Sequence, residues 1–468
     1  MNKIKNIAVL LLILFIAMGC EKFLDVNTDP NYPTDVKPEY LLASGEGGLA
    51  YYMGFEMNYK ALLICQHWST IYSQYWDTDK YRLLPTDYDN TWSNNYADVL
   101  YDLKEANKLA EEAGKTNIAA IAKILMAYTF AVNTDTWGDI PYSQALKIEE
   151  TFTPAYDAQK DVYLGLLADL ESAVSELSGD IEPALTTQDI IFNGDIAKWK
   201  SFANTIQLRL LIRMSDTDEF DATKVNALIS GGQLIGSNDG NANFTYGTSD
   251  GNFNPLYERF NSPGRSKDLS ASSTLVDLLK NLNDPRLEVY FDMSPDTNVY
   301  VGNPNGYGAQ IENNYARISY SWWEPGNKEA QTRPTQFLTA AESYFLQAEA
   351  VAAGYTSGDA ASLYNQGVLA SMVQWGVSDD DANTYLAAHP YENMESIYLQ
   401  KYIALYDQGP ELYATWRKND YPALEVVANS QNGNRIPVKF PYPYNETSTN
   451  SNNIPNTDIN TRVWWDKQ

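Results

Sequence analysis

Residues 341–354 read AESYFLQAEAVAAG and residues 360–375 read AASLYNQGVLASMVQW, and this pair of stretches indicates the fold. In the first stretch, small and aromatic residues recur at spacings of three and four, which places them on one face of an α-helix. These residues are Ala341, Tyr344, Phe345, Ala348 and Ala352. The second stretch repeats the design after a turn that begins at Gly354. The sequence therefore predicts two helices joined by a short turn.

The same periodicity marks other parts of the chain. Apolar residues at helical spacing run over 92–113 and again over 118–132, with Gly114 between the two runs. A connection this short makes two helices antiparallel. Further helical patterns cover residues 163–177, 202–214, 392–407 and 410–418. The predicted fold class is therefore mainly all-α.

The alternation of small and large residues over 341–375 resembles a tetratricopeptide unit, in which alanines let helices approach and aromatic rings fill the gaps. No strict period runs through the chain, so we expect degenerate helical pairs and not a regular solenoid. Long irregular loops are predicted at 231–254 and 292–334, which are rich in Gly, Asn, Pro, Ser and Tyr. Loops of this length in a compact protein are usually functional.

Composition excludes several functional classes. With 468 residues and 44% apolar content, the chain can bury a large core, so disorder is excluded. The net charge of −27 opposes binding to nucleic acids, because it repels phosphate. Only two His and two Cys are present, which nearly excludes zinc cages, and we predict neither a metal nor a cofactor. Aromatic residues, at 13%, are abundant and suit half-wet ligand surfaces.

The amino terminus has the layout of a signal peptide. Lys3 and Lys5 precede the apolar run 7–18, which ends at Gly19 and Cys20. This run is too short to cross a bilayer, which takes about 20 residues. Residues 17–20 (AMGC) resemble a bacterial lipobox, although Ala17 replaces the more usual leucine. We therefore predict a lipoprotein signal peptide over 1–19 and acylation of Cys20; an ordinary secretory signal is the alternative.

Six short motifs occur in order along the rest of the chain. They are FLDVNTDPN at 23–31, WGDIPY at 137–142, WKSFAN with LRL at 199–210, DPRL at 284–287, FLQAEA at 345–350 and RVWWD at 462–466. Together they resemble the SusD/RagB-like outer-membrane lipoproteins of Bacteroidetes-type bacteria, and the resemblance runs from end to end. We expect Trp137 to lie in a packed turn and Asp284 to pair with Arg286, because buried tryptophan and paired charges are ordinary core features.

The resemblance implies a single SusD-like helical domain over 20–468, built on four tetratricopeptide-like pairs. It also implies a lipid-anchored protein of the outer membrane that faces the cell exterior. Its partner would be a SusC-like TonB-dependent transporter, to which it would deliver oligosaccharides or peptides. No catalysis is expected.

Two stretches have the composition of a sugar site, which needs aromatic platforms beside groups that both donate and accept hydrogen bonds. They are 68–96 and 300–323. The predicted ligand residues are Tyr72, Tyr75, Trp76, Tyr81, Tyr320, Trp322 and Trp323. For the pair Trp322 and Trp323 we expect one ring packed inward and the other facing solvent, as in extended chain. The alternative for the first stretch is an amphipathic helix whose rings belong to the core.

Two other functions remain open on the sequence. An all-helical glycoside hydrolase would need two nearby carboxylates, for which Asp77 with Asp79, or Asp87 with Asp89, are candidates. A helical scaffold that binds only another protein is the second alternative. The acidic charge favours neutral over acidic glycans as ligands.

Overall fold

The computed structural model describes residues 36–72, 75–263, 268–308 and 312–467. Residues 38–468 form one compact unit. The predicted signal peptide, the acylation site Cys20 and the motif at 23–31 lie outside the described residues.

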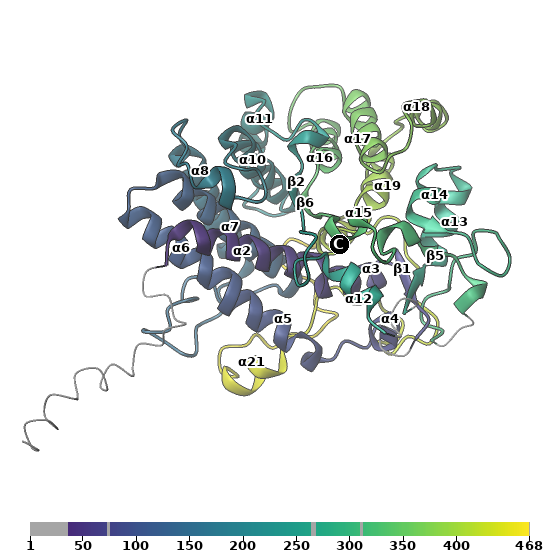
Figure 1. Cartoon of the computed structure of the whole chain (residues 1–468), viewed down its shortest axis with the longest axis horizontal. Helices are drawn as coiled ribbons and strands as arrows, with labels where there is room; N and C mark the ends of the chain where they lie inside the picture. The colour runs from purple at the N-terminus through teal and green to yellow at the C-terminus, as the bar shows by residue number, and fades with distance from the viewer. Residues whose placement is uncertain (1–35, 73–74, 264–267, 309–311, 468) are drawn as a thin grey trace, which may run out of the picture. The chain divides into compact units, whose positions relative to one another are not determined.

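Helices dominate the described chain, as the periodicity predicts (Figure 1). The helices are α2 (Pro38–Gly54), α3 (Glu56–Ile64), α4 (Trp76–Asp79), α5 (Asp89–Asn94), α6 (Tyr101–Glu112), α7 (Thr116–Trp137), α8 (Gln159–Glu176), α9 (Leu185–Gln188), α10 (Ile196–Arg213), α11 (Ala222–Gly231), α12 (Pro255–Asn261), α13 (Ser273–Asn281), α14 (Arg286–Tyr290), α15 (Lys328–Thr332), α16 (Ala340–Ala352), α17 (Ala360–Gln374), α18 (Asp379–Ala388), α19 (Met394–Ala404), α20 (Gly409–Asn419) and α21 (Tyr444–Thr449). Short 3-10 turns are η2 (Pro85–Tyr88), η4 (Asn238–Gly240), η5 (Glu312–Asn314) and η6 (Tyr320–Trp322), and η3 (Asn95–Leu100) is a π-helix.

Strands are short and pair only two at a time. β1 (Trp68–Thr70) pairs with β3 (Leu269–Ala271), β2 (Ala242–Phe244) with β6 (Thr335–Leu338), and β4 (Phe291–Asp292) with β5 (Arg317–Ile318), all antiparallel. These pairs join segments that are far apart in the sequence. They therefore connect helices and loops to one another and do not form a separate β-sheet layer.

Four successive helix pairs make up most of the core. The pairs are α6 with α7, α8 with α10, α16 with α17, and α19 with α20, and each contacts the next. In Figure 1, α6, α7, α8 and α10 lie towards the left of the unit, and α16, α17 and α19 lie in its upper part. The pair that opens the sequence analysis shows why the helices pack closely. A Cβ atom on Gly367 would lie 2.6 Å from the ring of Phe345, so only glycine lets α17 approach α16 at this point.

Buried ion pairs link these helices. Arg209 of α10 donates from Nε to Glu342 of α16 at 2.6 Å, and Arg213 pairs with Asp135 of α7. Glu411 of α20 contacts both arginines, and all five side chains are at least nine-tenths buried. Charges that are removed from water are tolerated only when they are paired and hydrogen-bonded. The LRL motif thus places Arg209 at the centre of the helical core.

The other motifs also have structural roles, as predicted. Trp137 is fully buried and donates from Nε1 to the carbonyl of Pro441 at 3.0 Å. Arg286 and Asp284 form an ion pair of 2.6 Å with both side chains fully buried. Trp465 near the carboxyl end donates from Nε1 to Asp135 at 2.8 Å, which ties the end of the chain to the buried ion pairs. These motif residues are therefore part of the packed interior.

Helix α7 lies at the centre of the helical core. Among the described residues it is the one helix long and apolar enough to cross a membrane, and 83% of its most apolar window is buried inside the protein. It contacts α6 on one side and α8 on the other. Its apolar character is therefore accounted for by packing between helices.

Candidate functional site

The two stretches with sugar-site composition lie side by side in the structure. Asn303 donates from Nδ2 to the carbonyl of Thr70 at 3.1 Å, and Asn305 donates to the carbonyl of Trp68 at 2.8 Å. The loop that follows α14 is thus pinned to β1, although more than two hundred residues separate them. Residues 303–305 of the second stretch therefore lie beside β1 of the first stretch.

A buried carboxylate holds this junction together. Asp79, at the end of α4, accepts hydrogen bonds from Asn305 Nδ2 at 2.7 Å and from the Gly306 amide at 2.6 Å. Burial raises the pKa of Asp79 to about 7, against the opposing effect of these two hydrogen bonds. Gly306 has a φ of +83°, and a Cβ there would lie 1.9 Å from the carbonyl oxygen of Ala428. The close approach of loop and helix therefore requires glycine at this position.

Three of the predicted ligand residues present a ring to solvent. Tyr72 is 46% exposed and Tyr320 is 51% exposed. Trp76 is partly exposed, with Lys80 Nζ 5.2 Å from its ring centroid. Its indole Nε1 is buried and has no partner among the described residues. These three rings are the members of the predicted set that a ligand can reach from solvent.

The other four predicted residues are buried. They are Tyr75, Tyr81, Trp322 and Trp323. Tyr75 accepts a hydrogen bond from Arg259 Nε at 2.7 Å, and the hydroxyl of Tyr81 accepts one from Gln66 at 2.9 Å. Trp322 and Trp323 are 8% and 7% exposed, so the expectation that one of them faces solvent is wrong.

The local backbone explains why both tryptophans are buried. Residues 320–322 form the 3-10 turn η6, so consecutive side chains do not point to opposite sides as they do in extended chain. Trp322 stacks on Trp375 at 5.1 Å, with the Arg333 guanidinium 3.3 Å above its ring. Trp323 packs against Phe260 at 4.4 Å. Tertiary partners that the sequence does not reveal decide the orientation of both rings.

A polar hollow of about 300 Å³ opens between α3, α4 and η2, and we call it the Tyr75 cleft. Its lining residues are Glu56, Tyr59, Lys60, Tyr75, Asp77, Thr78, Thr86, Asp87 and Asn90. The rings of Tyr59 and Tyr75 lie 4.8 Å apart at its base. Tyr75, although mostly buried, therefore remains a wall of the site.

Charge in the Tyr75 cleft is mainly negative. Lys60 donates to the carbonyl of Asp87 at 2.5 Å and to Glu56 at 3.4 Å, so its ammonium is occupied by protein groups. Burial lowers the pKa of Lys60, and partial burial raises the pKa of Asp87. The hydroxyl groups of a neutral ligand can donate hydrogen bonds to the carboxylates of this cleft. A carboxylate on a ligand has no proton to donate and does not match them.

Sequence reasoning did not single out six residues of this cleft, which are Glu56, Tyr59, Lys60, Thr78, Thr86 and Asn90. Tyr59 and Lys60 lie in a predominantly apolar helix, and Thr86 lies in the turn η2, so neither composition nor spacing distinguishes them. Their only sequence signal is proximity to the aromatic stretch. The fold brings α3 against α4 and makes them one wall.

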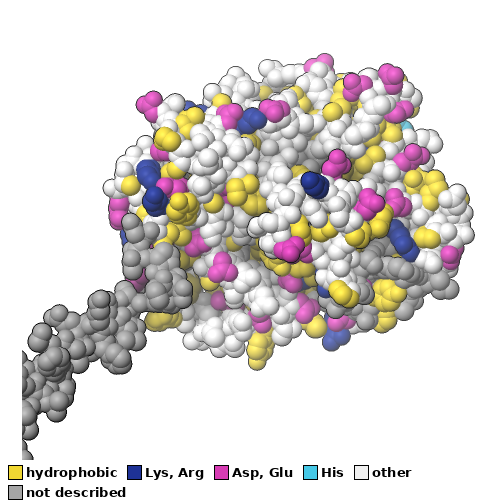
Figure 2. Space-filling view, in the orientation of Figure 1, with side chains coloured by type: hydrophobic (Ala, Val, Ile, Leu, Met, Phe, Trp, Pro, Cys, Tyr) yellow, Lys and Arg dark blue, Asp and Glu magenta, His cyan; other side chains and the backbone are white. Residues whose placement is uncertain are grey.

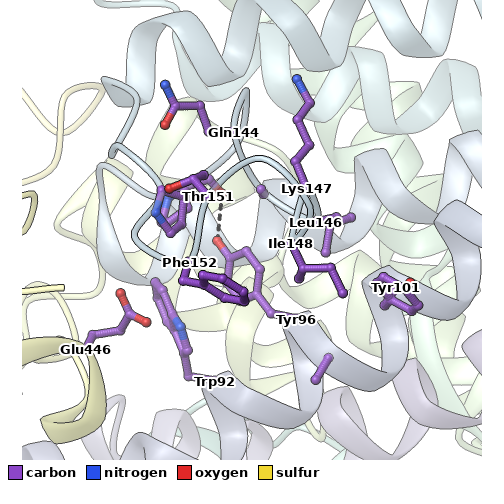
Figure 3. Close-up of a pocket in the computed structure, with 14 residues that line it drawn as sticks. Trp92, Tyr96, Tyr101, Gln144, Leu146, Lys147, Ile148, Thr151, Phe152 and Glu446 are labelled. Carbon is purple, nitrogen blue, oxygen red and sulfur yellow. Dashed lines mark hydrogen bonds between the residues drawn. The ribbon is translucent and has the colours of Figure 1, made fainter. Parts of the chain in front are cut away.

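A larger hollow, of about 470 Å³, lies between α5, α6 and the loop before α8 (Figure 3). Its walls are mostly apolar, and Figure 3 shows Trp92, Tyr96, Ile148 and Phe152 around it. Phe152 is 90% exposed. The hydroxyl of Tyr96 is occupied by the carbonyl of Pro141 at 2.9 Å. The hollow also has polar lining residues, among them Gln144, Lys147 and Glu446, but its surface is mostly apolar, whereas that of the Tyr75 cleft is mostly polar.

Of the carboxylate pairs nominated for glycoside hydrolysis, Asp77 with Asp79 is not an accessible pair. Asp79 is fully buried and bonded to Asn305 and Gly306, whereas Asp77 lies beside Arg82 at 3.4 Å. Asp89 accepts a hydrogen bond from the Asn445 amide at 2.7 Å. Within the described ranges, no three His, Cys, Asp or Glu side chains group as metal ligands would.

Comparisons with known proteins agree with the geometry. Over residues 30–443 the chain matches the model of a SusD-like family, described as starch-binding and associating with the outer membrane. A search of curated protein sequences found no match.

Solved structures share the whole architecture. The structure of a chitin-binding protein is 26% identical, with a TM-score of 0.80 over 92% of this chain and 100% of that one. A SusD homologue from Bacteroides uniformis is 23% identical, with a TM-score of 0.78 and the same coverage. A chitin-binding SusD homologue from Flavobacterium johnsoniae is 23% identical, with a TM-score of 0.76 over 91% of this chain and 98% of that one.

Proposed function

Because this chain belongs to the SusD-like family of starch-binding proteins that associate with the outer membrane, we propose that it captures oligosaccharides outside the cell. It then delivers them to a SusC-like TonB-dependent transporter. The observation that carries the proposal is the polar Tyr75 cleft, together with the exposed rings of Tyr72, Trp76 and Tyr320 in the two predicted stretches. Aromatic faces bind the C–H faces of sugars, and the cleft binds their hydroxyls.

A glycan fits this surface better than a peptide. The chitin-binding relative supports a carbohydrate ligand. The acceptor-rich cleft and the net charge of −27 favour neutral glycans over acidic ones. Figure 2 shows acidic side chains scattered over one face, with few basic ones among them.

The proposed attachment to the membrane is through a lipid on Cys20. Three acyl chains hold firmly, since each buried methylene contributes about 0.8 kcal/mol. With Cys20→Ala, labelled palmitate should no longer be incorporated, and the protein should leave the outer-membrane fraction. Continued sedimentation of this variant with outer membranes contradicts the anchor.

Binding is tested by isothermal calorimetry with the full chain in detergent, using maltohexaose, chitohexaose and a peptide digest. Trp76→Ala should weaken glycan binding about tenfold, which corresponds to about 1.4 kcal/mol. Tyr40→Ala is the matched control. Tyr40 is 54% exposed on α2, but it lines neither the Tyr75 cleft nor the cavity that adjoins it. Equal glycan affinity of Trp76→Ala and wild type contradicts the proposed site, and binding of the peptides alone contradicts the ligand class.

The protein is proposed to bind without catalysis. The purified chain, incubated with the same two oligosaccharides, should release no new reducing ends. Sustained release that depends on Asp77 or Asp87 indicates a hydrolase instead.

A further inference from the structure

A second polar hollow, of about 290 Å³, adjoins the Tyr75 cleft, and we call it the Asn95 hollow. It shares Glu56 and Asn90 with that cleft as lining residues. Its other walls come from α2, which contributes Tyr51, and from α5 with η3, which contribute Asn94 and Asn95. The two cavities are therefore neighbours along the same helices.

The backbone at this hollow is unusual. Residues 95–100 form the π-helix η3 between α5 and α6. π-Helices are rare and occur frequently at functional sites, because they disturb the regular hydrogen bonding of a helix. Gly48 of α2 faces η3 so closely that a Cβ would lie 2.9 Å from Val99 Cγ2. The hollow thus lies where two helices are in close contact and one of them is distorted.

An unsatisfied polar group lies in the wall. Asn95 is only 1% exposed, and its Nδ2 donates to Asn133 Oδ1, which also accepts from the hydroxyl of Tyr52 at 2.9 Å. The Oδ1 atom of Asn95 has no partner among the described residues. A buried acceptor without a partner is unfavourable, and Asn133 Nδ2 also lacks a partner among the described residues, so the packing of η3 against α7 leaves two polar atoms unsatisfied.

The remaining walls define the ligand chemistry. The Tyr51 ring is 49% exposed, and the amides of Asn90 and Asn94 are exposed to solvent. Glu56 and Asp98 contribute carboxylates, and none of the described residues that line the hollow is Lys or Arg. One aromatic face, two amides and several acceptors suit a neutral, hydroxyl-rich ring, whereas a uronic acid would be repelled.

We propose that the Asn95 hollow is a second sugar subsite. It extends the Tyr75 cleft, so that successive units of one oligosaccharide occupy the cleft and the hollow. The inference rests on the proposed function, since it assigns a further unit of the same ligand. Affinity should therefore rise with the length of the oligosaccharide, and part of that rise should depend on Tyr51 and Asn94.

The test compares short and long ligands on the full chain. Maltose, maltohexaose, diacetylchitobiose and chitohexaose are titrated by calorimetry into the wild type, Tyr51→Ala and Asn94→Ala. Both variants should weaken binding of whichever hexasaccharide the wild type binds about five- to tenfold, and should leave binding of the corresponding disaccharide unchanged. Tyr40→Ala, which removes an equally exposed ring from the same helix, should match the wild type with every ligand.

Other outcomes separate this inference from the proposed function. If Trp76→Ala weakens binding of both lengths but Tyr51→Ala and Asn94→Ala do not, the subsite is overturned and the binding function stands. Equal loss for disaccharide and hexasaccharide in Tyr51→Ala also overturns a separate subsite. If the wild type binds neither the maltose nor the chitin oligosaccharides, the subsite is overturned. The calorimetry described under the proposed function, which includes peptides, then decides whether the protein binds a nutrient at all. Circular dichroism of each variant identifies a loss that is due to misfolding.

Discussion

The helix pairs of the core and the region around β1, α4 and the loop at 303–306, which we call the ligand-facing region, are held together by different kinds of contact. In the pair α16 and α17, contacts such as that between Phe345 and Gly367 join neighbours in sequence, and local periodicity places them. In the ligand-facing region, Asn305 contacts Trp68 and Asp79, which are more than two hundred residues away. The first region is specified by repeating local patterns, and the second depends on long-range contacts.

The two regions also treat polar groups differently. The helical core pairs every charge of its central cluster, as Glu411 does with Arg209 and Arg213. The ligand-facing region leaves Asn95 Oδ1 and Trp76 Nε1 without partners among the described residues, and it exposes aromatic rings. Paired charges stabilise a fold, whereas exposed aromatic rings and polar side chains that line a cavity are available to a ligand. The comparison predicts that substitutions in the two regions affect different measurements.

The largest expected effect is on stability and comes from the helical core. Glu411→Gln leaves Arg209 and Arg213 with one carboxylate partner fewer in a buried cluster, and breaking such pairs costs about 3–5 kcal/mol. Chemical denaturation should show this loss in the free energy of unfolding. The glycan affinity of the folded variant should be unchanged.

The matched control is the exposed pair of Lys224 and Glu171, in which both side chains are about half exposed. Lys224→Ala should cost at most about 1 kcal/mol, because solvent screens surface pairs. Similar losses in Glu411→Gln and Lys224→Ala would contradict the assigned role of the buried cluster.

The next effect depends on pH, is spread over several pH units and is expected from Asp79. Its pKa in the folded protein, about 7, is above that of an unfolded aspartate, so folding takes up a proton. The stability it contributes is fully present below about pH 4 and is lost as the pH rises through about 7. Between these limits, the wild type should lose up to about 1.4 kcal/mol per pH unit relative to Asp79→Asn.

Thermal denaturation of both proteins from pH 4 to pH 8 measures this difference. Glu46 and Asp407 also have raised pKa values from burial, but they are common to both proteins and cancel in the comparison. Parallel stability curves for the wild type and Asp79→Asn would show that Asp79 keeps an ordinary pKa.

The smallest effect is expected at the apolar hollow. Phe152 is 90% exposed, and substitutions at such positions change stability by about 0.5 kcal/mol or less. Phe152→Ser should therefore leave both the unfolding free energy and the glycan affinity unchanged. A marked loss of glycan affinity in this variant would move the ligand from the Tyr75 cleft to the hollow of Figure 3.

Most of the helical architecture was predictable from sequence. The runs at 92–113 and 118–132 correspond to α5 through α7, and the pattern over 341–375 corresponds to α16 and α17. The six motifs predicted a SusD-like family, and the match over residues 30–443 confirms it. Helix periodicity is a local property, so it can be read without knowing what each helix packs against.

The candidate site was only partly predictable. The composition of 68–96 and 300–323 indicated an aromatic, polar surface, and the fold brings these stretches together through Asn303 and Asn305. The same composition did not distinguish the exposed Tyr320 from the buried Trp322 and Trp323. Their exposure depends on Trp375, Phe260 and Arg333, which lie elsewhere in the chain. Whether the seven predicted residues contact a ligand stays a prediction.

The sequence by itself determined that the protein is helical, acidic and a member of its family, because repeat spacing, charge and ordered motifs are properties of the chain. Only the tertiary structure decided which aromatic rings are reachable and which polar atoms lack partners. Exposure and hydrogen-bond satisfaction depend on contacts between distant segments, such as the hydrogen bonds that Asp79 accepts from Asn305 and Gly306. No local pattern encodes such contacts.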